Sequence, residues 1–153
     1  MSQQTKVAVL GLGAMGHAFA SNLLKKGFRV SGWNRSAGKG EDLVPAGLQL
    51  ADSVSEAVSE AAVIITMLSD GDTTLNIAAQ AAEAFSAQAK FCQMGTIGAH
   101  ATTLLQKLAQ QKCSDVVFLV VPASWTKAPS ENPTILFFAS CPRSRPPPVA
   151  LGS

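Results

Sequence analysis

The fold is decided by residues 7–36, which read VAVLGLGAMGHAFASNLLKKGFRVSGWNRS. The short β-branched run Val7–Leu10 predicts a strand, and apolar residues at helical spacing then predict a helix that ends at Gly27. Between the two, Gly11–Gly16 has the spacing G-x-G-x-x-G. A glycine-rich turn that follows a strand and opens a helix indicates a dinucleotide-binding turn.

The alternation of strands and helices continues along the chain. Further strands are predicted over Arg29–Trp33, Leu48–Leu50, Ala62–Leu68, Lys90–Gln93, Val116–Val121 and Ile135–Ala139. Further helices are predicted from a capping box at Ser53–Glu56, from the N-cap signal at Ser69 and Asp70 to about Ala84, and over Ala99–Lys112. Strands that are apolar on both faces need helices on both sides of their sheet. We therefore predict an α/β fold, a doubly wound Rossmann sheet that is mainly parallel with helices on both faces.

The composition excludes several classes of protein. Of the 153 residues, 47% are hydrophobic and 14% are charged, which is typical of a chain with a buried core. The net charge of +2 is spread along the chain, so no nucleic-acid partner is expected. No secretory leader or membrane-spanning run is predicted. Cys92, Cys113 and Cys141 lack metal-site spacing and indicate reduced thiols in a cytoplasmic protein.

The C-terminal segment differs from the rest of the chain. Residues Cys141–Ser153 read CPRSRPPPVALGS, with four prolines. Such a segment cannot continue a helix or a central strand. We therefore expect residues 1–140 to form one nucleotide-binding domain and residues 141–153 to be a disordered tail.

Each glycine of the turn has a predicted role. Gly11 permits the tight turn, Gly13 lets the backbone approach a diphosphate, and Gly16 allows the helix to pack closely on the strand. The N–H groups and the dipole at the start of the helix would hold the phosphates. The predicted cofactor-binding residues of this turn are Gly11, Leu12, Gly13, Ala14, Met15 and Gly16.

The end of the second strand predicts which dinucleotide binds. An NAD-binding protein usually has Asp or Glu here, about 20 residues after the glycines, to bind the ribose 2′-hydroxyl. This chain instead has Asn34, Arg35 and Ser36. Asn34 does not repel a phosphate, and Arg35 can donate charge-assisted hydrogen bonds to one. The sequence therefore favours NADP over NAD.

Residues 7–36, followed by VIITMLSD at 63–70, resemble the β-hydroxyacid dehydrogenases. That group includes 3-hydroxyisobutyrate dehydrogenase, glyoxylate and succinic semialdehyde reductases and, more distantly, imine reductases and 6-phosphogluconate dehydrogenase. The resemblance extends over about Lys6 to Ser140, and Val121–Leu136 looks most like the glyoxylate/semialdehyde reductase branch. It implies hydride transfer between NADP(H) and a small hydroxy acid or aldehyde, in a homo-oligomer.

The resemblance also implies roles for residues outside the glycine-rich turn. Met67 and Leu68 would lie along the cofactor, and the loop Met94–Ile97, with Thr96, would reach the nicotinamide side. Ser124 matches a serine that helps bind the substrate carboxylate. The family's catalytic lysine lies further on, at the start of a long helix that enters an all-helical second domain. We expect that helix and that domain to be absent here, and we predict no catalytic residue in this chain.

The sequence departs from the family pattern at three further positions. Gly95 stands in place of a serine, Trp125 in place of a glycine, and Pro133 in place of a later glycine. Lys127 matches a loop lysine of the family and is interpreted as a solvated charge. Three hypotheses therefore stay open. They are part of an aldehyde or hydroxy-acid reductase, an imine reductase-like enzyme, and a non-catalytic NADP-binding module that serves through association.

Overall fold

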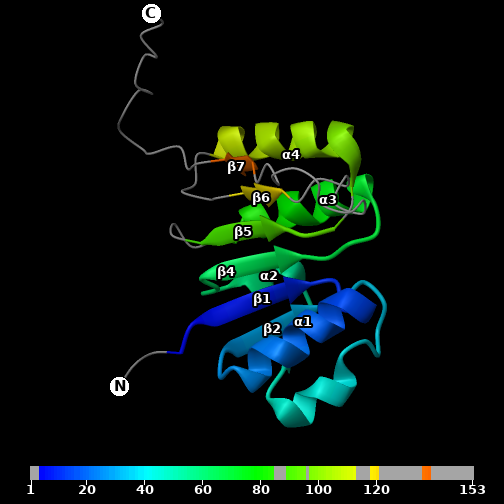
Figure 1. The fold of residues 1–153 in the computed structure, drawn as a ribbon, viewed down its shortest axis with the longest axis vertical. Coiled ribbons are helices and arrows are strands. Elements are labelled where there is room, and N and C mark those ends of the chain that lie inside the picture. The colour runs from blue at the N-terminus through cyan, green and yellow to red at the C-terminus, as the bar shows by residue number, and fades with distance from the viewer. Residues whose placement is uncertain (1–3, 85–88, 96, 113–117, 121–135, 139–153) are drawn as a thin grey trace, which may run out of the picture.

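The structure is a computed structural model that describes residues 4–84, 89–95, 97–112, 118–120 and 136–138. Within these residues, one sheet of seven strands has the order β3-β2-β1-β4-β5-β6-β7 (Figure 1). The strands are β1 Lys6–Leu10, β2 Arg29–Trp33, β3 Gln49–Leu50, β4 Val63–Thr66, β5 Lys90–Gln93, β6 Phe118–Val120 and β7 Leu136–Phe138. Strands β1 to β6 pair in parallel, and β7 is antiparallel to β6.

Helical segments connect most of these strands. They are α1 Ala14–Lys25, the 3₁₀ helix η1 Glu41–Ala46, α2 Val54–Val58, α3 Gly71–Ala82 and α4 Gly98–Lys112. Ser53 caps α2, because its side chain accepts a hydrogen bond from the Glu56 N–H at 3.1 Å. Asp70 caps α3 in the same way through the Thr73 N–H at 2.7 Å. Both helices begin where the sequence predicts.

Side chains of alternate residues in β1 point to opposite faces of the sheet, and each face has its own core. Ala8 and Leu10 belong to a buried cluster with residues of α2, α3 and α4. Val9 belongs to a second cluster, with Ala20 of α1 and Leu43 of η1. The predicted doubly wound sheet with helices on both faces is therefore confirmed.

Two local features differ from the prediction. The 3₁₀ helix η1 was not predicted, and it lies between Gly40 and Gly47, which both have positive φ. A six-residue segment that contains Pro45 has too little helical periodicity to be recognised. Strand β4 ends at Thr66, whereas the apolar run predicted a strand as far as Leu68. Apolar character alone cannot locate a strand end when the following residues are also half-buried.

The strand order fixes where a ligand can bind. Strand β1 pairs with β2 on one side and with β4 on the other. The chain moves outward from β1 through β2 to β3 and then crosses back to β4. In open α/β sheets, the crevice at the carboxyl ends of the strands beside such a reversal is where ligands bind. Here that crevice lies where β1 and β4 end.

Candidate cofactor site

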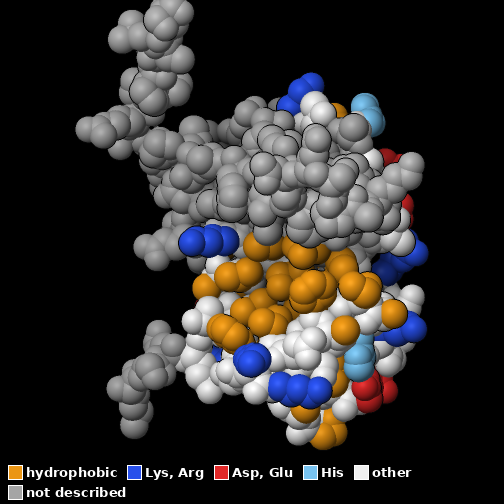
Figure 2. Space-filling model, viewed as in Figure 1, with side chains coloured by type: hydrophobic (Ala, Val, Ile, Leu, Met, Phe, Trp, Pro, Cys, Tyr) orange, Lys and Arg blue, Asp and Glu red, His pale blue; other side chains and the backbone are white. Residues whose placement is uncertain are grey.

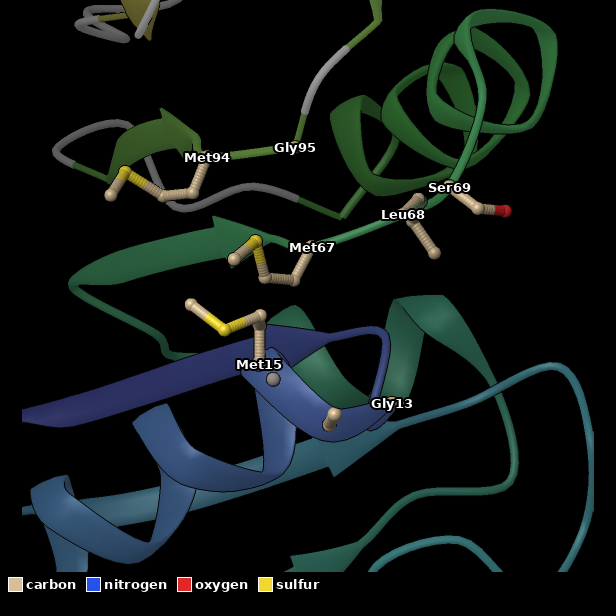
Figure 3. Close-up of a pocket in the computed structure, with 9 residues that line it drawn as sticks. Gly13, Met15, Met67, Leu68, Ser69, Met94 and Gly95 are labelled. Atoms are coloured by element: carbon tan, nitrogen blue, oxygen red, sulfur yellow. The ribbon is translucent and has the colours of Figure 1, made fainter. Parts of the chain in front are cut away.

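A pocket of about 520 Å³ opens at this crevice. It is lined by three segments, each of which follows the carboxyl end of a strand (Figure 3). Gly13 and Met15 lie on one side, Met94 and Gly95 lie on the other, and Met67 lies between them. The lining residues are Gly13, Ala14, Met15, Gly16, Met67, Leu68, Ser69, Met94 and Gly95.

Gly11 is required by the conformation and packing of the turn. Its φ is +101°, and its N–H donates to the Trp33 carbonyl at 2.8 Å. A Cβ on Gly11 would lie 2.5 Å from the Met67 carbonyl oxygen. The turn after β1 is therefore held between the ends of β2 and β4.

Gly16 and Gly13 differ in what surrounds them. A Cβ on Gly16 would lie 1.7 Å from the Gly11 carbonyl oxygen, so the first turn of α1 packs directly on the loop before it. Gly13 has an ordinary extended conformation, and apart from its chain neighbours no atom of the described residues lies within 4 Å of the place its Cβ would take. Since Gly13 lines the pocket, a side chain there would occupy space open to a ligand. Of the three glycines in the G-x-G-x-x-G turn, Gly13 is therefore the one that neither backbone conformation nor packing within the described residues requires to be glycine.

The start of α1 is suited to an anion. Its N-cap is Gly13, no side chain caps the helix, and its first turn has no acidic residue. The N–H groups of a first helical turn have no partner within the helix, and the dipole makes this end positive. Phosphate oxygens can accept hydrogen bonds from these N–H groups, and their negative charge is favoured at the positive end of the helix. The residues present therefore fit the diphosphate of a dinucleotide.

Asn34 connects the turn after β1 to the loop after β2. Its Oδ1 accepts a hydrogen bond from the Leu12 N–H at 2.9 Å, and its Nδ2 donates to the Ser36 carbonyl at 3.0 Å. The Leu12 side chain is buried in the core beside α1. The sequence indicates only that Asn34 does not repel a phosphate. Its hydrogen bond to Leu12, which braces the two loops against each other, could not be predicted because it depends on which loops come together in the fold.

Arg35 is exposed at the same edge of the sheet. Within the described residues, no hydrogen bond or ion pair holds its guanidinium. Its charge reaches Asp70, whose pKa is lowered first by the backbone and side-chain hydrogen bonds from Thr73 and to a smaller extent by Arg35. The end of β2 and the start of α3 are thus close enough for the charge of Arg35 to act on the Asp70 carboxylate.

The residues predicted from the sequence separate into three groups. Those that line the pocket are Gly13, Ala14, Met15, Gly16, Met67 and Leu68. Those that shape the turn or lie at the end of β2 are Gly11, Leu12, Asn34, Arg35 and Ser36. Thr96 and Ser124 lie outside the described residues, as do Trp125, Lys127, Pro133 and the predicted tail. Ser69 also lines the pocket, although the sequence indicated it only as the start of a helix.

None of the nine lining residues has a side chain that ionises near neutral pH. His17, on α1, lies 2.6 Å from the Asp42 carboxylate of η1, and His100 is exposed on α4. The described residues contain no cluster of metal-ligating side chains. They also contain no helix that is both long and apolar enough to span a membrane.

Comparisons with known proteins agree with the geometry of this pocket. The family described as the NAD binding domain of 6-phosphogluconate dehydrogenase matches residues 6–147. Glyoxylate/succinic semialdehyde reductase 1 of Arabidopsis thaliana is 30% identical over 138 residues, which is 88% of this chain and 47% of that reductase. The chain therefore spans about half the length of this relative.

Solved structures of similar oxidoreductases share the fold of this chain. A 3-hydroxyisobutyrate dehydrogenase from Mycobacterium tuberculosis superposes with a TM-score of 0.70 at 27% identity, covering 76% of this chain and 40% of that chain. The reductive aminase from Aspergillus terreus in complex with NADPH and ethyl levulinate superposes with a TM-score of 0.64 at 26% identity, with the same coverage of both chains. The chain belongs to the family of the NAD-binding domain of 6-phosphogluconate dehydrogenase.

Proposed function

We propose that this chain is the NADP-binding domain of an oxidoreductase that transfers hydride between NADP(H) and a small hydroxy acid or aldehyde. The observation that carries the proposal is Gly13, a pocket residue that nothing in the described protein requires to be glycine. A dinucleotide explains it, because its diphosphate needs the backbone to be bare at that point. The similarity to the Arabidopsis reductase supports the substrate class.

Each part of the cofactor has proposed partners in this chain. The diphosphate would be held by the N–H groups at the start of α1, and the 2′-phosphate by Arg35 and Ser36. Met67 and Leu68 would lie along the nicotinamide half, with Thr96 beside it and Ser124 at the substrate carboxylate. The bound cofactor supplies the hydride, and the protein binds and orients it.

Calorimetry with NADPH and NADH tests the cofactor. We expect NADPH to bind at least about tenfold more tightly, the effect of roughly one added charge-assisted hydrogen bond. Equal affinities would reject the preference for NADP, and failure of both cofactors to bind would reject the dinucleotide site itself.

We also propose that the 153-residue chain, taken alone, binds NADPH without turnover. Reduction of a carbonyl needs a proton donor beside the developing alkoxide, and the nine described residues that line the pocket offer none that ionises near neutral pH. We expect no NADPH consumption above background with glyoxylate or succinic semialdehyde. Consumption that depends on Ser124 would contradict this.

A second candidate is reduction of an imine, which the similarity to the NADPH-bound reductive aminase favours. The same assay with a ketone and an amine distinguishes the two activities. If neither substrate is reduced, the third hypothesis, a non-catalytic module that binds NADP and acts through association, gains support.

We further propose that residues 1–140 form the NADP-binding domain, that residues 141–153 lie outside it, and that the protein is a cytoplasmic homo-oligomer. Limited proteolysis of the NADPH complex tests the boundary. The expected stable fragment ends near residue 140. A fragment that ends well before it would contradict the assignment.

A further inference from the structure

A buried polar pair lies beneath the far side of the pocket. Thr66 ends β4 and Gln93 ends β5, and both side chains are fully buried. The Thr66 hydroxyl donates a hydrogen bond to Gln93 Oε1. The Gln93 Nε2 in turn donates to the Gly95 carbonyl at 2.8 Å. The amide of Gln93 therefore connects the end of β4 to the loop that follows β5.

This pair differs from an ordinary core contact. Burying an amide and a hydroxyl costs free energy that apolar side chains of similar size would not incur, so each group must be hydrogen-bonded. Here both ends of the Gln93 amide are used, and one of the two bonds is to the backbone of Gly95, a residue that lines the pocket. The polar groups thus give the loop a side-chain attachment at Gly95 that an apolar pair would not provide.

Gly95 shows how closely that loop is held. A Cβ on Gly95 would lie 2.5 Å from the Leu68 carbonyl oxygen. The Met94 N–H also donates to the Thr66 carbonyl at 3.0 Å, which continues the pairing of β4 and β5 beyond the strands. The loop after β5 therefore packs directly against the loop after β4, and residues of both loops line this side of the pocket (Figure 3).

On the proposed function, this side receives the nicotinamide half of the cofactor. The 2′-phosphate would lie beyond β2 and the diphosphate at α1, so the remainder extends past β4 toward β5. We infer that Thr66 and Gln93 are positioning residues, which hold the Met94-Gly95 segment against the nicotinamide half of NADP through the hydrogen bond from Gln93 to Gly95.

The test compares two ligands, NADPH and adenosine 2′,5′-bisphosphate, which lacks the nicotinamide half. Thr66→Val removes the hydroxyl and keeps the shape, and Thr66→Ser is the matched control that keeps the hydroxyl. We expect Thr66→Val to weaken NADPH binding about tenfold, the scale of one lost hydrogen bond, and to change the affinity for the bisphosphate less than about twofold. Thr66→Ser should retain the wild-type ratio of the two affinities.

Gly95→Ala is the second variant. Its Cβ would lie 2.5 Å from the Leu68 carbonyl oxygen and 3.3 Å from Gln93 Nε2, so it displaces the loop that the Gln93 amide holds, and it should also weaken NADPH binding selectively. Equal weakening of both ligands in these variants, or no change in NADPH affinity, would overturn the inference while leaving the proposed function intact. A wild-type chain that binds neither ligand would instead reject the proposed function, and the inference with it.

Discussion

At the scale of single residues, Gly13 and Gly16 lie three positions apart but respond to different surroundings. Gly13→Val places its side chain in the pocket, where no described residue other than the chain neighbours lies within 4 Å of the new Cβ. We expect NADPH binding to be lost. The free energy of unfolding should fall by at most about 1 kcal/mol, the scale of a weakened N-cap. Calorimetry and urea unfolding measure the two effects.

Gly16→Val is the matched control for that experiment. Its Cβ would lie 1.7 Å from the Gly11 carbonyl oxygen, so α1 or the turn must move. We expect a loss of about 3 kcal/mol in the free energy of unfolding, at the upper end of typical overpacking. If Gly13→Val binds NADPH as tightly as the wild type, the assignment of the diphosphate to this turn would be wrong.

Arg35 carries the predicted choice of cofactor. Arg35→Ala should cost about 1.5–3 kcal/mol of NADPH binding, the range for a hydrogen bond to a charged group, and should affect NADH much less. Arg29→Ala is a suitable control, because Arg29 is an exposed arginine at the opposite end of β2. Equal losses in the two variants would mean that net charge, and not a local contact, attracts the cofactor.

At the scale of elements, the sequence located most strands and helices but not all of their ends. The starts of α2 and α3 were predictable because Ser53 and Asp70 cap them through local hydrogen bonds. The helix η1 was not, since its buried residue Leu43 packs in a core cluster with Leu12, which is distant in the sequence. The end of β4 was not either, because the apolar run continues through Met67 and Leu68 beyond the last strand residue. The brace from Asn34 to Leu12 joins residues 22 positions apart, and no local pattern encodes it.

The cap of α3 predicts a pH dependence of stability. The pKa of Asp70 lies below its ordinary value of 3.8, first because the Thr73 N–H and hydroxyl donate to the carboxylate. A lowered pKa in the folded state means that the ionised cap stabilises the protein fully above 3.8, and that this contribution is lost as the pH falls through the folded value.

Asp70→Asn isolates that contribution, because asparagine caps helices without ionising. The difference in unfolding free energy between wild type and Asp70→Asn should be constant near neutral pH and should shift in favour of the variant as the pH falls below 3.8. Urea unfolding of both proteins between about pH 6 and pH 2.5 measures it. Parallel curves over that range would show that the carboxylate is not responsible.

At the scale of the whole molecule, the two edges of the sheet differ. Strand β3 ends the sheet on one side and has two residues, Gln49 and Leu50. Strand β7 ends the strand order on the other side and reads Leu-Phe-Phe. Within the described residues, β7 pairs with β6 alone. Both edge strands are short, which opposes pairing with another chain, but the sequence of β7 is wholly apolar, which favours it.

Exposed apolar surface adds to this asymmetry. Figure 2 shows hydrophobic side chains gathered in one area of the described surface. Among the described residues, the exposed large hydrophobic side chains include Met15 and Phe28, which are 61% and 39% exposed. Apolar surface of this kind is typical of regions that another element or chain covers.

We therefore predict that the 153-residue chain self-associates at micromolar concentration, and that the β7 edge contributes to the contact. Light scattering should show a dimer or a larger species. Phe137→Lys, which places a charge in β7, should shift the equilibrium toward the monomer, because charged residues on an edge strand oppose pairing with another chain. Leu50→Lys is the matched control, since it places the same charge in β3 at the opposite edge and should leave the mass unchanged. Monomeric wild-type protein would contradict self-association. If dimers persist equally in both variants, the β7 edge does not form the contact, and the apolar area in Figure 2 becomes the candidate for it.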